Sequence, residues 1–72
     1  MATHDYTGRG VDLYDDALLL VDAAQIQVGD HVLVGWAHGV VRYRVRDVSY
    51  CPGYPEYWRV QIELLESAGD AP

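Results

Sequence analysis

The stretch HVLVGWAHGVVRYRVRDVSY, residues 31–50, decides the fold because apolar and polar side chains alternate along it on both sides of a turn signal. Over residues 31–36 the bulky side chains fall on one face, at Val32, Val34 and Trp36. This is the pattern of a half-buried strand. The pair His38–Gly39 predicts a two-residue turn in which glycine accepts a positive φ. Residues 40–50 are then expected to run back as the antiparallel partner.

A turn at His38–Gly39 also fixes the register of this predicted hairpin. The expected cross-strand partners are Trp36 with Val41, Val34 with Tyr43, and Val32 with Val45. Every inward residue then meets another inward residue, as a stable pairing requires. The alternation breaks at Asp47, which predicts a β-bulge or a sharp bend at that point.

The segment CPGYP, residues 51–55, contains two prolines and a glycine and predicts a loop. Residues 56–66 then resume period two and predict a last strand, whose inward residues are Trp58, Val60, Ile62 and Leu64. Because the chain has no Phe, we expect its two tryptophans to anchor the core.

The segment before residue 31 is more ambiguous. Its apolar run favours a strand over residues 17–22, while a short helix capped by Asp15 and a single helical turn at Asp22–Gln25 remain open alternatives. Residues 1–12 and 67–72 lack a periodic apolar pattern and predict a flexible or loosely docked N-terminal arm and a flexible C-terminal tail. A single β domain is expected over residues 13–66.

The string AAQIQVGDHVLV, residues 23–34, resembles the Ala-x-x-Leu-x-x-Gly-Asp-x-Val signature that opens a strand in small β-barrels, including SH3-like domains and the Hint domain of inteins. The resemblance implies that Gly29 takes a special backbone conformation and that Asp30 caps the corner. Hint domains splice with a His-Asn pair, and this sequence contains no Asn, so no splicing chemistry is expected. The expected fold is mainly β: a small antiparallel meander, curled into an SH3-like barrel or a strongly twisted sheet.

Charge and cysteine usage restrict the partners and the compartment. The formal net charge is −6, from 11 acidic and 5 basic residues, and such a field repels phosphate backbones and anionic lipids. A single cysteine excludes an intramolecular disulfide, and no apolar run approaches a membrane span. We therefore expect a cytoplasmic protein with no membrane partner. Lys, Asn and Phe are absent while Ala, Gly, Val, Asp and Arg are plentiful, which is the bias of GC-rich codons and favours a bacterium or a phage host cell as the source.

Little in the sequence indicates catalysis or metal binding. Cys51 could pair with His4, His31 or His38, but it precedes a proline, and no Asn is present to orient the imidazole. The histidines are not spaced as zinc ligands, and the aspartates at positions 12, 15, 16 and 22 lack the glycine-punctuated pattern of a calcium loop. We expect no enzyme, no metal and no cofactor.

The alternating arginines are the main candidate for a binding surface. Arg42, Arg44 and Arg46 share the face opposite the apolar residues, and the last strand adds Arg59 and Tyr57. Guanidinium groups beside tyrosine can grip phosphates, stack on bases or bind an acidic protein. The alternative is that they pair with acids of the same chain, such as Glu56 and Glu63. The candidate binding residues are Arg42, Arg44, Arg46, Tyr54, Tyr57 and Arg59.

These observations favour a small non-enzymatic protein-binding module that uses the arginine-tyrosine face or the CPGYP loop. We expect it to act as a phage-encoded or bacterial accessory regulator with an unidentified protein partner. One alternative is a nucleic-acid-binding β-barrel that reads single strands through the arginines. Another is a self-assembling structural subunit of a virion or assembly, and a homodimer also remains open because sheet edges and outer apolar residues need cover.

Overall fold

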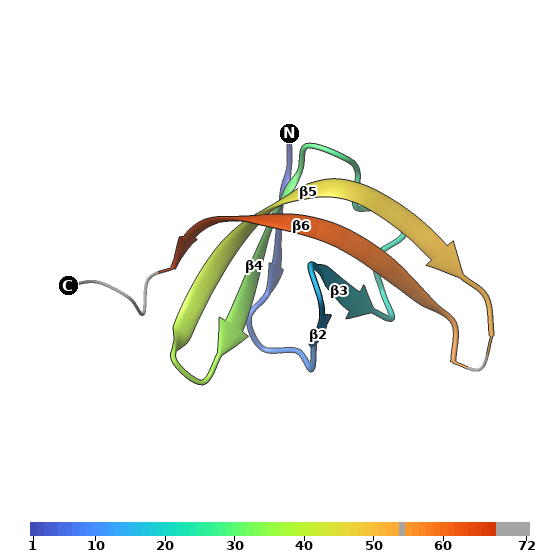
Figure 1. Cartoon of the computed structure of the whole chain (residues 1–72), viewed down its shortest axis with the longest axis horizontal. Coiled ribbons are helices and arrows are strands. Elements are labelled where there is room, and N and C mark those ends of the chain that lie inside the picture. The colour runs from blue at the N-terminus through green and yellow to red at the C-terminus, as the bar shows by residue number, and fades with distance from the viewer. Residues whose placement is uncertain (54, 68–72) are drawn as a thin grey trace.

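The computed structural model describes residues 1–53 and 55–67, which form a single six-stranded sheet without helices (Figure 1). The strands are β1 (Thr3–Tyr6), β2 (Asp12–Tyr14), β3 (Ala17–Leu20), β4 (His31–Trp36), β5 (Gly39–Cys51) and β6 (Tyr57–Ser67). Their order across the sheet is β1-β4-β5-β6-β3-β2. The mainly β prediction is confirmed, but β1 and β2 remain the two edges of an open sheet, so the described residues do not form a closed barrel.

The β4–β5 hairpin forms as predicted, but its register is displaced by two residues. Val34 lies opposite Val41 and not Tyr43, and the turn residues are Ala37 and His38. Gly39 lies beyond the turn and starts β5 with a φ of +139°. A displacement of two residues leaves every side chain on its original face, so the alternation alone could not distinguish the two registers.

The long strands β5 and β6 carry the curvature of the sheet. The bulge predicted at Asp47 is confirmed, because the pairing of β5 with β6 shifts between Val45 and Asp47, and it shifts again between Arg42 and Tyr43. Figure 1 shows both strands arching over the rest of the molecule, with their connecting loop far from the β4–β5 turn. Bulges increase the local twist and bend the strand that contains them.

The predicted strand over residues 17–22 is confirmed for residues 17–20, where β3 lies between β6 and β2. The helical alternative is wrong for this segment. The stretch Asp22–Gln25 belongs to no helix; it contains an isolated turn in which the Ile26 amide donates to the Ala23 carbonyl. This connection between β3 and β4 places Ala23 and Ile26 in the core.

The N-terminal segment differs from the expected loose arm. Thr3–Tyr6 form β1, which pairs with β4 in parallel, so the sheet is mixed and not purely antiparallel. Tyr6 is buried in the core, and its hydroxyl donates to the Asp22 carbonyl and accepts from the Gln25 side chain. Residues 12–14 form the opposite edge strand, β2. Of the predicted C-terminal tail, residues 67–72, Ser67 is the last residue of β6, and the rest lies outside the described residues.

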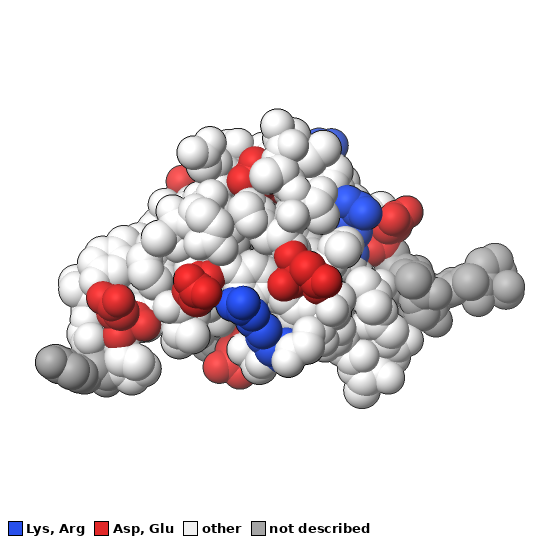
Figure 2. Space-filling model, turned by 180° about the vertical axis from the view of Figure 1, so that it is seen from behind, with Lys and Arg blue, Asp and Glu red and all other residues white. Residues whose placement is uncertain are grey.

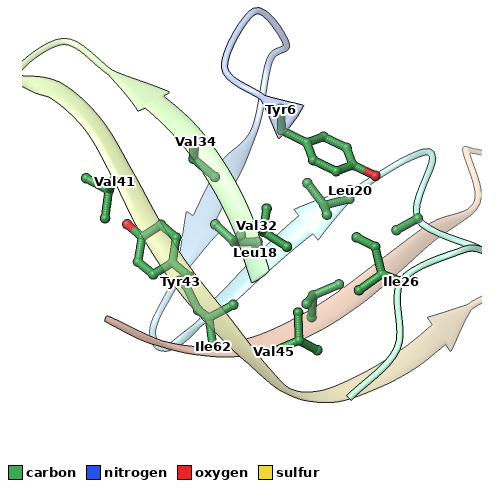
Figure 3. Packing of buried hydrophobic residues seen from close by; sticks show 12 residues of the cluster. Tyr6, Leu18, Leu20, Ile26, Val32, Val34, Val41, Tyr43, Val45 and Ile62 are labelled. Atoms are coloured by element: carbon green, nitrogen blue, oxygen red, sulfur yellow. The ribbon is translucent and has the colours of Figure 1, made fainter. Parts of the chain in front are cut away.

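The core lies on the concave face of the sheet, where aliphatic side chains from β3, β4, β5 and β6 meet Tyr6 and Tyr43 (Figure 3). Contrary to expectation, the tryptophans do not anchor it: Trp36 and Trp58 are half-buried at its margin. Leu64, predicted to point inward, is 63% exposed, because β3 pairs only with residues 58–61 of β6 and leaves the end of that strand uncovered. None of the described residues belongs to a helix long and apolar enough to cross a membrane.

Candidate functional site

The three arginines of β5 lie on the convex face, as their alternation with core residues predicts. Each one is within ion-pair distance of a glutamate on β6. Arg42 Nε lies 3.4 Å from Glu66 Oε1, Arg44 Nη1 lies 3.3 Å from Glu63 Oε1, and Arg46 Nη1 lies 3.7 Å from Glu63 Oε2. Cross-strand pairing of β5 with β6 therefore places acids beside all three guanidinium groups.

We call Arg42, Arg44 and Arg46 the arginine row; with Glu63 and Glu66 beside it, this surface carries both charges. Arg42 also donates from Nη1 to Nδ1 of His31 on β4 at 3.1 Å, so its guanidinium has partners on both neighbouring strands. In Figure 2, which shows the molecule from behind, the basic side chains stand next to acidic ones and do not gather into a patch. Exposed pairs of this kind contribute only about 0–1 kcal/mol each to stability, but they reduce the positive field that a phosphate would encounter.

The other two described candidates lie farther along the sheet, past the bulge at Asp47. Arg59 is half-buried and faces Ser49 on β5 and Leu19 on β3. Tyr57 begins β6 opposite Cys51, and the hydrogen bond between these two side chains raises the pKa of the tyrosine. Tyr54, the remaining candidate, lies outside the described residues. The structure thus separates Arg59 and Tyr57 from the ion-paired arginines of β5.

Aromatic side chains gather where β5 and β6 approach their connecting loop. Tyr50 and Trp58 are direct cross-strand partners with ring centroids 5.1 Å apart and planes inclined by 53°. Tyr50 is 51% exposed and Tyr57 is 36% exposed. We call this end of the β5–β6 hairpin the hairpin tip. Tyr50 and Trp58 lie on one of its faces and Tyr57, opposite Cys51, lies on the other, and Pro52 and Pro55 are exposed in the connecting loop.

A hydrogen bond orders the hairpin tip internally. The Tyr50 hydroxyl donates to Glu56 Oε2 at 2.5 Å, and this carboxylate raises the pKa of the tyrosine. Tyr50 is therefore held by two contacts, the hydrogen bond of its hydroxyl to the carboxylate and the tilted packing of its ring against Trp58. The sequence reasoning missed this pair, because it assigned Trp58 to the core. The signal was the loop itself, since an antiparallel pairing across CPGYP brings Tyr50, just before the loop, close to the aromatic residues that follow it.

A second polar cluster surrounds Asp30, which is only 7% exposed. Its carboxylate accepts hydrogen bonds from the amides of Ala2 and Gln27, both at 3.1 Å, and lies 2.8 Å from His4 Nε2. With the His4 bond as the largest cause, these donors lower the pKa of Asp30 to about 2. The neighbouring Gly29 has a φ of +93°, so the special glycine and the capping aspartate implied by the sequence resemblance are both observed.

The Asp30 cluster is structural in character, since every group around the carboxylate belongs to the N-terminal strand or to the turn it closes. The other histidines are elsewhere: His31 contacts Arg42, and His38 lies in the β4–β5 turn. Over residues 1–53 and 55–67, no three His, Cys, Asp or Glu side chains converge as metal ligands, and no pocket was found.

The acidic residues near the N-terminus are dispersed along the β2–β3 hairpin. Asp12 lies on β2, Asp15 and Asp16 form the turn, and Asp22 pairs with Arg9 at 3.1 Å. Asp15 is the one described residue other than glycine with a positive φ, at 56°. Aspartate tolerates this conformation better than most residues do.

Comparison of the chain with protein-family models, with curated proteins and with solved structures found no match, so its function has to be argued from these surfaces alone.

Proposed function

We propose that this chain is a non-enzymatic protein-binding module and that the hairpin tip is its contact surface. The observation that carries the proposal is the exposure of an aromatic residue on each face of the hairpin tip, Tyr50 beside Trp58 on one face and Tyr57 on the other. Aromatic residues are enriched at the centres of protein interfaces, because they bury a large area while losing few rotatable bonds. Pro52 and Pro55 add apolar surface to a loop whose backbone they stiffen.

The ion pairs of β5 favour the hairpin tip over the arginine row. A ligand that binds Arg44 or Arg46 must compete with Glu63, which already lies within ion-pair distance of both. A phosphate would in addition be repelled by that carboxylate and by the net charge of −6. The exposed apolar area of the hairpin tip can be buried without breaking an ion pair, and its burial contributes roughly 25 cal/mol per Å².

The proposal is tested by affinity capture from a lysate of the organism that encodes the chain, with four baits. These are the wild type, Tyr50→Thr/Tyr57→Thr, Arg42→Ala/Arg44→Ala/Arg46→Ala, and Leu64→Thr. Threonine preserves the strand propensity of the replaced residues, and Leu64 provides an exposed apolar position away from the tip. We expect one protein to be captured by all baits except the double tyrosine variant, with or without nuclease.

Each other result contradicts a defined part of the proposal. Loss of capture with the arginine variant but not with the tyrosine variant would move the site to the convex face. Recovery of nucleic acid alone, lost on nuclease treatment, would favour the nucleic-acid-binding alternative. Recovery of the bait protein alone would favour self-assembly. Thermal melting of each bait shows beforehand that the substitutions leave the sheet folded.

A further inference from the structure

Within residues 1–53 and 55–67, strand β2 forms one edge of the sheet and has β3 as its only strand partner. Its three residues, Asp12, Leu13 and Tyr14, are all exposed. Unlike the hairpin tip, this surface offers main-chain groups as well as side chains. An edge strand with unsatisfied N–H and C=O groups is a template onto which another extended segment can pair.

The ladder shows which backbone groups of β2 point outward. The Ile62 amide on β6 donates to the Asp16 carbonyl at 3.0 Å, so the backbone groups of Asp16 point toward β6. Because these groups alternate along a strand, those of Ala17 and Leu19 point toward β2, where they meet Tyr14 and Asp12. The N–H and C=O of Leu13, between them, must point away from β3. No backbone partner for Leu13 occurs among the described residues.

The charge around this edge is negative. Asp12 lies on the strand, and Asp15 and Asp16 form the turn that follows it, while no Lys or Arg occurs between residues 10 and 41. In the sheet, Arg59 shares the row of Asp12 but lies two strands away, a separation of about 10 Å. Arg9 is paired with Asp22. A segment pairing with β2 thus meets a main-chain donor and acceptor flanked by carboxylates.

We propose that the edge of β2 binds an extended, lysine- or arginine-rich segment of a partner protein, which adds to the sheet as a seventh strand. The main-chain groups of Leu13 supply the pairing, Leu13 supplies an apolar contact, and Asp12 and Asp15 select for positive charge. A second copy of this chain does not fit, because its own β2 would bring like charges together. The proposal does not depend on the hairpin tip being a contact surface.

The opposite edge of the sheet, β1, differs from β2 because groups at its end are already bonded within the chain. On β1, the Tyr6 carbonyl already accepts from the Arg9 amide, and the Asp5 carboxylate accepts from the amide of Thr7. The chain therefore folds back at the end of that strand.

The test uses three short blocked peptides: lysine alternating with valine, glutamate alternating with valine, and the lysine peptide with N-methylated valines. Binding is followed by the amide chemical shifts of the ¹⁵N-labelled protein. We expect only the unmethylated lysine peptide to shift the amides of residues 11–16, and added salt to weaken its binding. Equal shifts with the methylated peptide would show that charge alone attracts the lysine peptide, which contradicts pairing through the main chain. The absence of shifts at β2 with all three peptides would also overturn the proposal.

Two variants at one position separate main-chain pairing from side-chain contact. Leu13→Pro removes the outward N–H while leaving the bonds of Asp12 and Tyr14 to β3 intact, and proline is tolerated at such edge positions. Leu13→Thr removes the leucine side chain but keeps the N–H. We expect the proline variant to fold and to lose the shifts, and the threonine variant to retain most of them.

Two double variants test the contribution of the carboxylates. Asp12→Asn/Asp15→Asn should weaken binding of the lysine peptide several-fold, whereas Asp47→Asn/Glu56→Gln, with the same change in net charge, should alter it little. Equal weakening by both pairs would show a general field effect and contradict the site. Dimerisation of the protein alone, measured by sedimentation and abolished by Leu13→Pro, would assign the edge to a second copy instead.

Discussion

Asp30 links the N-terminal strand to the turn that precedes β4. Its nearly buried carboxylate has an amide donor on each side of the junction, from Ala2 and from Gln27, and His4 of β1 lies beside it. A buried carboxylate is tolerated because these groups replace the water it has lost. The resemblance to the Gly-Asp signature implied that Asp30 caps the turn, but not that a residue 26 positions earlier completes its contacts.

The lowered pKa of Asp30 predicts a specific acid sensitivity. Because its folded-state pKa falls from 3.8 to about 2, the carboxylate stabilises the fold above the unfolded-state pKa, and this stabilisation is lost as the pH falls toward 2. Asp30→Asn should therefore melt below the wild type at about pH 5, with the difference shrinking toward pH 2. Asp47→Asn, at an exposed site, is the control and should follow the wild-type profile. A constant difference across this range would show that ionisation of Asp30 does not contribute.

At the scale of elements, strand identity was easier to predict than strand neighbours. Alternation identified β4, β5 and β6 and located the bulge after Val45, because burying one face imposes period two on the sequence. It could not fix the β4–β5 register, since a slip of two residues preserves both faces. It also missed β1, a four-residue strand with a single buried apolar side chain, Tyr6.

The packing of β1 depends on Gly35 in β4. A Cβ atom at this position would lie 2.6 Å from the Thr7 carbonyl oxygen, which is closer than real contacts allow. Gly35→Ala should therefore push the segment after β1 away and cost roughly 1–3 kcal/mol of the free energy of unfolding. Gly10→Ala is the control, because nothing lies within 4 Å of a Cβ there. Urea denaturation measures both, and equal stability of the two variants would contradict the described contact.

At the scale of the whole molecule, the sequence predicted a small β fold but not that its sheet would stay open. Alternation reports which face of a strand is buried and carries no information about whether two distant edges meet. The same limit applies to the candidate site. The arginine row was predicted on the correct face, but its pairing with Glu63 and Glu66 became visible only with the register of β5 against β6. That pairing is what shifts the proposed contact to the hairpin tip.

The most direct test of that claim is photo-crosslinking in the living cell with a benzophenone amino acid placed singly at position 57 or at position 64. Both side chains are exposed and lie on β6, but only Tyr57 belongs to the hairpin tip. We expect the probe at position 57 to give a covalent adduct with one other protein, and the probe at position 64 to give none. An adduct at position 64 alone, or adducts only with nucleic acid or with a second copy of the chain, would contradict the assignment of the hairpin tip as a protein-binding surface.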